Sequence, residues 1–305
     1  MATWEAAIPS SSKGSGLTSE ERRSVTHGDF WIPEDEREKY KRALAALNRA
    51  GIPFVVSGAY AIYEHTGIYR ETKDLDLFLT PDKMIEAAVA LRDEGFRMRL
   101  EQPHWLAKAT LGEHFVDLIF GMGNGLALID DDWYRYSKPA ILAANPVRVS
   151  PVEELIWHRL FISERHRHDM ADILHLILCQ GSRIDWHRLL EKIGEHWPLL
   201  LSQLQMFSYV YPEARSHVPP AVIDTLLERS REDLGRERGG DPSTRGPMIS
   251  RFSFAIDVNE WGMLDLREQS IRIMEQLPVV RQIATADIWE DHSDMTRDYL
   301  RRYHA

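Results

Sequence analysis

Two aspartates interrupt an apolar run in the segment DLDLFL, at Asp74 and Asp76. Strands disfavour aspartate because its short side chain competes for backbone hydrogen bonds and its charge resists burial. Successive side chains of a strand point to opposite faces, so both carboxylates share one face while Leu75 and Leu77 point to the other. Two carboxylates at this spacing repel each other unless a cation lies between them, and such oxygen ligands suit Mg²⁺. The pair therefore predicts a magnesium site.

A third acid breaks a later apolar run, Asp117 in HFVDLIF. If that strand lies beside the first, three carboxylates converge. Two metal ions about 3.5–4 Å apart would then clamp the attacking and leaving oxygens of a phosphoryl transfer. The alternative is an edge strand with a single acid that points into solvent.

The step Ser57-Gly58 ends one apolar strand and opens a helix. A helix N-terminus offers unpaired N–H groups and the positive end of a dipole, which suit a phosphate, and glycine lets the backbone approach closely. Ser57 has two interpretations that can coexist: it donates its hydroxyl to a phosphate, or it caps the helix.

In this order the residues resemble the polymerase-beta-like nucleotidyltransferase superfamily. Its pattern is a Gly-Ser or Gly-Gly step opening a helix, an Asp-x-Asp on the next strand and a third carboxylate on a later strand. Here the order of the step is Ser-Gly. The run Arg70-x-Thr72-x-Asp74-x-Asp76 is similar to the abortive-infection-type branch, which includes nucleotidyltransferase toxins, and to small antibiotic-modifying nucleotidyltransferases. The resemblance implies that Arg70 and Thr72 belong to the nucleotide-binding site, where Arg70 contacts a phosphate or fixes the turn.

The segment SPVEELIWHRLFISERHRHDMADILHLI adds to this resemblance. It implies that Arg159 contacts the nucleotide phosphates and that Asp169 organises the site, although His168 stands where relatives carry an arginine. By spacing, Arg165, Asp169 and Asp172 share one helix face. The ordinary interpretation of Arg159 is a helical arginine paired with a glutamate.

The elements that position these residues alternate between strand and helix and then become helical, which predicts an α+β protein. We expect a nucleotidyltransferase-type mixed β-sheet domain with flanking helices, followed by a mainly helical domain. Three parts are expected: a mobile N-terminal segment at 1–30, the catalytic domain at 31–150 and the helical C-terminal domain at 151–305. Asp82 is expected to cap the helix that follows it, and the alternation within residues 248–268 hints at a small hairpin.

The length, charge and cysteine content of the chain limit the classes of function that it can have. The chain has 305 residues, a net charge of −10 and one cysteine, Cys179, so it forms no intrachain disulfide. It contains neither 18 consecutive apolar residues nor a secretory signal, so we expect a cytoplasmic protein with no membrane partner. Proteins that grip long nucleic acids usually carry a basic excess, so the acidic balance favours a small or cationic partner.

The resemblance thus implies an enzyme that moves a nucleoside monophosphate from a nucleoside triphosphate, such as ATP, to an acceptor hydroxyl or phosphate. Mg²⁺, as two ions, would be held by Asp74, Asp76 and Asp117, which would also be the catalytic residues. A small-molecule acceptor is favoured. The alternatives are a toxin-like nucleotidyltransferase that acts on tRNA and a degenerate nucleotide-binding protein without catalysis.

Overall fold

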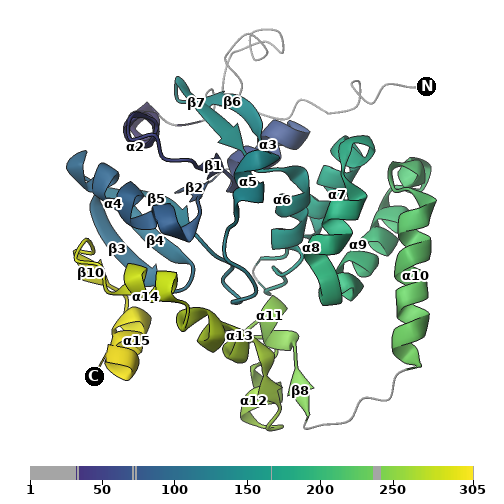
Figure 1. The fold of residues 1–305 in the computed structure, drawn as a ribbon. Helices are drawn as coiled ribbons and strands as arrows, with labels where there is room; N and C mark the ends of the chain where they lie inside the picture. The colour runs from purple at the N-terminus through teal and green to yellow at the C-terminus, as the bar shows by residue number, and fades with distance from the viewer. Residues whose placement is uncertain are drawn as a thin grey trace.

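Within the residues that the structure describes, eight strands form one mixed sheet in the order β10-β3-β4-β5-β2-β1-β7-β6 (Figure 1). The neighbours β2 and β5 run parallel, as do β1 and β7, whereas β3, β4 and β5 form an antiparallel series. The computed structural model describes residues 32, 34–70, 72, 74–165, 167–235 and 242–304. The segment 1–30, which the sequence predicts to be mobile, lies outside the described residues.

The strands of this sheet are short. They are β1 Val55–Val56, β2 Asp74–Phe78, β3 Arg97–Gln102, β4 Leu106–Leu111, β5 His114–Ile119, β6 Lys138–Leu142, β7 Asn145–Val149 and β10 Asp291–His292. A separate parallel pair consists of β8 Ser243–Thr244 and β9 Leu264–Asp265.

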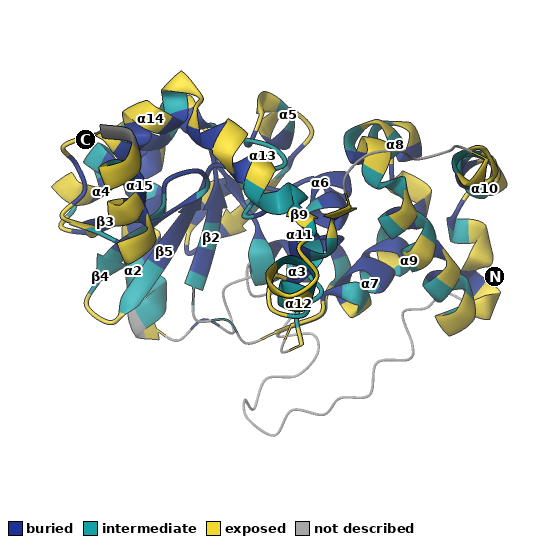
Figure 2. Ribbon diagram, turned by 90° about the horizontal axis from the view of Figure 1, so that it is seen from below, coloured by how far each residue is buried: buried dark blue, intermediate teal, exposed yellow. Residues whose placement is uncertain are grey.

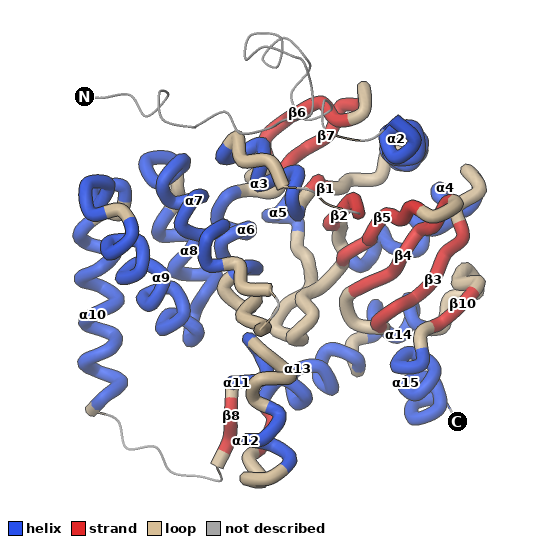
Figure 3. Tube along the Cα trace, turned by 180° about the vertical axis from the view of Figure 1, so that it is seen from behind, coloured by secondary structure: helices blue, strands red, loops and turns tan. Residues whose placement is uncertain are grey.

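The helices fall into three groups along the chain. The first group lies within and around the sheet sequence: α2 Glu34–Arg49, α3 Gly58–Thr66, α4 Met84–Asp93 and α5 Asp131–Arg135. The second is the helical region α6 Val152–Arg159, α7 Met170–Gln180, α8 Trp186–Ile193, α9 Trp197–Val210 and α10 Pro220–Leu234. The third is α11 Gly246–Ile249, α12 Ala255–Asn259, α13 Leu266–Glu275, α14 Pro278–Ala284 and α15 Asp294–His304. In Figure 3 the red strands and the helices α6–α10 form two neighbouring blocks, with α11–α13 below both.

The sheet is covered on both faces because its strands alternate between two apolar cores. Leu75 and Leu77 of β2 belong to the core formed with α2, α4, α14 and α15. Phe78 belongs to the other core, which extends into α3 and the helices α6–α10. Burial colouring shows dark blue along much of the central strands β2 and β5, with yellow exposed residues on outer helices such as α10 and α14 (Figure 2). Asp74 and Asp76 share the face opposite Leu75 and Leu77, as the period of two predicts.

The predicted α+β class, a mixed sheet with flanking helices followed by a mainly helical region, is confirmed. Two local predictions are wrong. Asp82 does not cap α4, because a 3₁₀ turn over Pro81–Lys83 runs directly into that helix. The hairpin expected within 248–268 is replaced by the short helices α11 and α12 and by the parallel pairing of β8 with β9.

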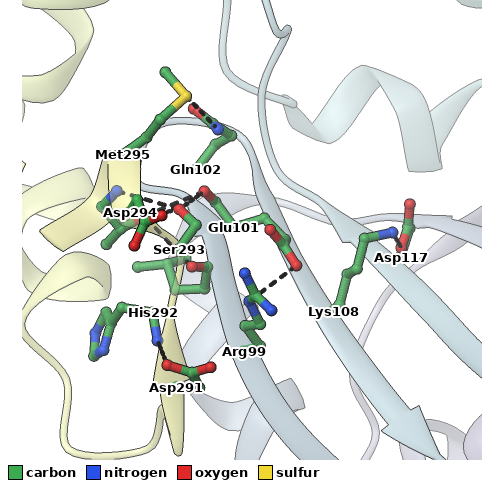
Figure 4. Close-up of polar contacts among 12 residues, drawn as sticks. Arg99, Glu101, Gln102, Lys108, Asp117, Asp291, His292, Ser293, Asp294 and Met295 are labelled. Carbon is green, nitrogen blue, oxygen red and sulfur yellow. Dashed lines mark hydrogen bonds and ion pairs between the residues drawn. The ribbon is translucent and has the colours of Figure 1, made fainter.

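The last elements of the chain return to the sheet. β10 pairs in parallel with β3 at the sheet edge, and α15 contributes Tyr299 to the core shared with α2 and α4. The Ser293 hydroxyl donates to the carbonyl of Glu101, and Figure 4 shows this docking beside Gln102 and Met295. The division at residue 150 stays a prediction, but the chain after α13 packs with the sheet rather than with α6–α10. No described helix combines the length and the apolar character needed to cross a bilayer.

Candidate active site

The three predicted acids meet on one face of the sheet. Asp76 of β2 and Asp117 of β5 are direct partners in the parallel register, and Asp74 lies two residues earlier on the same strand. One carboxylate oxygen from each lies within 4.8 Å of one from each of the others. The hydroxyl of Thr72 donates to Asp74 Oδ1 at 2.7 Å, which fixes the rotamer of that carboxylate. The three acids, which lie apart in the sequence, therefore form one cluster in the folded protein.

The cluster concentrates negative charge in a partly buried place. Burial, followed by the charges of Asp74 and Asp117, raises the pKa of Asp76 to about 7. Burial likewise raises the pKa of Asp117, although the ammonium of Lys108 opposes that shift. Neighbouring carboxylates repel each other when they are ionised, and a cation between them stabilises the ionised form. The donor set of hard oxygens fits Mg²⁺.

Lys108 is a residue of the site that the sequence reasoning missed. It is the register partner of Asp117 on β4, and its Nζ lies 2.6 Å from Asp117 Oδ1 (Figure 4). The same ammonium lies 4.1 Å from the centre of the Phe115 ring. The signal that would have found it is the one that found Asp117: a charged residue inside an apolar strand, here WLAKATL.

Ser57 and Gly58 form the start of α3 against β2. The backbone N–H of Ser57 donates to the carbonyl of Asp76 at 2.9 Å, which ties the helix start to the acidic strand. Gly58 has a φ of +59° and packs directly on the Asp76 carboxyl group, a position that favours glycine. The Ser57 side chain makes no capping hydrogen bond, so of its two interpretations the cap is absent. Ser57 lines the cavity described below.

Arg159 sits at the centre of a buried ion-pair network. Its guanidinium lies 2.5 Å from Asp169 and 3.5 Å from Asp172, and it donates to the Gly58 carbonyl at 3.3 Å. Arg70 lies 2.5 Å from Asp172. The partners are two aspartates, one at the N-cap of α7 and one within it, rather than the glutamate of the ordinary interpretation. The network joins α6 and α7 to the start of α3.

Asp169 holds two arginines at the start of α7. Burial acts to raise its pKa, but hydrogen bonds from Arg167 and the charge of Arg159 prevail, so the pKa is lowered. The helix face predicted for Arg165, Asp169 and Asp172 is wrong in two members, because α7 begins only at Met170, so that Arg165 lies before it and Asp169 is its N-cap residue. Contact of Arg159 with nucleotide phosphates stays a prediction, as do the nucleotide roles of Arg70, Thr72 and Asp169.

These residues line one cavity of about 810 Å³. Its size lies within the range of small-molecule binding sites. The predicted residues all lie on its wall. Residues that the sequence did not indicate join them: Trp105, His158, Arg167, Arg251, Phe252 and Arg267. The last three come from the region after α10, whose approach to the site depends on long-range packing.

Comparisons with known proteins give distant similarities. No family model and no curated protein matches the chain. Among solved structures, the chain is similar to the antibiotic-resistance factor ANT(2'')-Ia, with 18% identity over 58% of this chain and 99% of that chain and a TM-score of 0.41. It is also similar to the lincosamide antibiotic adenylyltransferase LnuA, with 15% identity over 48% of this chain and 96% of that chain and a TM-score of 0.35. A tRNA-processing enzyme shows 13% identity over 89% of this chain and 79% of that chain, with a TM-score of 0.29. At these values the functional assignment depends on the residues of the site.

Proposed function

We propose that this protein is a divalent-metal-dependent nucleotidyltransferase. The observation that carries the proposal is the cluster of Asp74, Asp76 and Asp117 on adjacent strands, directly beside the start of α3. Without a cation, the three carboxylates repel one another. Their oxygens are ligands that suit Mg²⁺, whose positive charge would offset this repulsion. When bound, Mg²⁺ would be held by these three acids, as two ions, and would neutralise charge on the triphosphate of the donor.

The start of α3 would seat the triphosphate. Ser57, Gly58 and Ala59 line the same cavity as the acids, and the Ser57 side chain makes no capping hydrogen bond. Gly58 lets a phosphate approach the backbone, and the dipole of the nine-residue helix favours negative charge there. Arg159 would hold the start of α3 in position through its hydrogen bond to the Gly58 carbonyl, and its positive charge would attract the triphosphate.

The reaction is a displacement at the α-phosphorus of a nucleoside triphosphate, such as ATP. The acceptor oxygen forms a new bond to that phosphorus, the bond to the bridging oxygen breaks and pyrophosphate leaves. Asp117 would accept the proton of an acceptor hydroxyl, because burial raises its pKa and makes it a stronger base than an exposed aspartate. Positioning and charge neutralisation would supply most of the rate enhancement.

The test measures transfer of label from α-³²P nucleoside triphosphates, with Mg²⁺, to a small aminoglycoside and to tRNA. We expect label on one acceptor class and equimolar release of pyrophosphate. Asp76→Asn should remove at least about two orders of magnitude of this activity. Asp82→Asn is the matched control, because Asp82 is exposed and lies outside the cavity. If the wild-type protein binds triphosphate but releases no pyrophosphate with either acceptor, it is the non-catalytic nucleotide-binding protein instead.

A further inference from the structure

Two arginines from the region after α10 reach the cavity. Arg251 follows α11, and Arg267 lies in the first turn of α13. Figures 1 and 3 both show α11 and α13 well below α3 and α7, on the other side of α6. The arginines therefore come from a different part of the fold than the start of α3, and both parts line the same cavity.

These two arginines differ from the other arginines of the cavity in their partners. Three guanidinium groups each lie within 4.0 Å of the carboxylate of Asp169 or Asp172, namely those of Arg70, Arg159 and Arg167. Within the part of the chain that the structure describes, neither Arg251 nor Arg267 has a carboxylate at that distance. The cavity therefore has a wall with two guanidinium groups available to an anion.

Backbone contacts hold both arginines in place without neutralising them. The two carboxylate oxygens of Glu164 accept hydrogen bonds from the Arg251 backbone N–H at 2.9 Å and from the Ser250 hydroxyl at 2.6 Å. Arg267 donates from Nη2 to the carbonyl of Gly123 at 2.8 Å, and among the described residues its other N–H groups have no hydrogen-bond acceptor. Burial and then the charge of Arg251 lower the pKa of Arg267, which is consistent with two neighbouring cations.

Aromatic rings accompany the two charges. Phe252 is 69% exposed, and the guanidinium carbon of Arg251 lies 5.4 Å from the centre of its ring. Trp105 lines the same cavity and lies against Gly123, whose carbonyl holds Arg267. Arginines bind phosphate through paired N–H groups, and exposed aromatic rings stack on bases.

We propose that Arg251 and Arg267 bind a phosphate of the acceptor, and that the acceptor is a nucleotide, either free or at the end of an RNA strand. This inference rests on the proposed function and corrects the preference for a cationic small molecule that the net charge suggested. A net charge of −10 favours recognition of a terminal nucleotide over binding along a long strand, because binding along a strand is usually supported by a basic excess.

The test separates binding from transfer. Full-length wild-type protein is titrated by fluorescence anisotropy with a labelled short single-stranded RNA, and by calorimetry with adenosine monophosphate and with a non-hydrolysable ATP analogue plus Mg²⁺. We expect Arg251→Ala and Arg267→Gln each to weaken binding of the RNA or the monophosphate by roughly tenfold, with affinity for the ATP analogue within about twofold. Arg272→Ala is the matched control, since Arg272 is an exposed arginine on α13 paired with Glu268 and outside the cavity. The melting temperature of each variant reports whether it folds.

Each outcome decides the inference. Weakening for RNA alone assigns the phosphate to an RNA end, and weakening for the monophosphate as well assigns it to a free nucleotide. Unchanged affinity for both probes in both variants, or a loss confined to the ATP analogue, overturns the proposal. Phosphate binding that depends on the arginines in a protein that never releases pyrophosphate would refute the nucleotidyltransferase assignment while leaving this site in place.

Discussion

Gly58 and Asp76 touch so closely that a Cβ atom on Gly58 would lie 1.8 Å from Oδ2 of Asp76. The start of α3 therefore packs directly against the acidic strand β2, and any side chain at position 58 would displace the Asp76 carboxylate. This contact explains why the helix that would seat the phosphates begins with glycine at the point where β2 carries its second acid.

The first prediction follows from that contact. Gly58→Ala should reduce metal-dependent transfer at least about a hundredfold, because a shift of about 1 Å at a catalytic group has that effect. Gly67→Ala is the matched control. Gly67 has a similar φ of +70°, but a Cβ there has no neighbour within 4 Å. Both variants should lose about 1 kcal/mol of stability from left-handed backbone strain. Equal activity in the two variants would show that the Asp76 contact has no catalytic importance.

The second prediction concerns Lys108, the cation already present beside the acids. Lys108→Met should destabilise the metal-free protein by about 1–2 kcal/mol, because it leaves Asp117 without its charged partner. The rise in melting temperature on adding Mg²⁺ should be larger in the variant than in the wild type, since a bound cation then relieves more repulsion. Lys83→Met is the control, because Lys83 pairs with Glu86 at the surface. A Mg²⁺ shift equal to or smaller than the wild-type shift would contradict this account.

The acidic site could be predicted from the sequence because its signals are local. A period of two places Asp74 and Asp76 on one face whatever the strand pairs with. The third acid joins them because β2 and β5 are parallel neighbours with Asp76 opposite Asp117. Lys108 carries the same local signal, a charge inside the apolar strand WLAKATL, so its place in the site could also be predicted from the sequence.

The C-terminal part could not be predicted because long-range contacts determine it. β10 is a two-residue strand that exists through its pairing with β3, about 190 positions away in the sequence. The apolar alternation after Pro247 suited a hairpin, yet Phe254 packs on Gly246 so tightly that a Cβ there would lie 2.2 Å from the ring. That packing favours two short helices. Short apolar runs of this kind fit either structure until their tertiary partners are known.

The third prediction links metal binding to protons. The pKa of Asp76, raised to about 7 by burial and by its two acidic neighbours, means that the metal-free carboxyl is largely protonated below pH 7. Mg²⁺ must displace that proton, so the apparent Mg²⁺ affinity should rise with pH, by about tenfold between pH 6 and pH 8. Calorimetry in buffers of different ionisation enthalpy at pH 6.5 should show proton release. Asp76→Asn should show none, and an equal absence in the wild type would refute the linkage.

The fourth prediction concerns stability away from the site. Glu275 of α13 is 6% exposed and faces the buried His104, whose Nδ1 lies 3.9 Å from Glu275 Oε1. Burial raises the Glu275 pKa to about 7 from 4.5. A raised pKa means that the folded state binds the proton more tightly, so this group's contribution is complete below pH 4.5 and is lost as pH rises through 7. Burial lowers the pKa of His104 to about 4, and that opposite contribution should remain nearly the same in wild type and variant.

Glu275→Gln stays neutral at every pH, so its advantage over the wild type should grow as pH rises from 4.5, where the carboxyl ionises in the unfolded chain, to about 7, where it ionises in the folded protein. We expect the two proteins to have nearly equal free energies of unfolding at pH 4. At pH 8 the variant should be more stable by about 1–2 kcal/mol. Urea denaturation at both pH values measures the difference, with Glu290→Gln as an exposed control. A constant difference across this range would mean that Glu275 ionises as readily in the folded protein as in the unfolded chain, and that its burial beside His104 carries no electrostatic penalty.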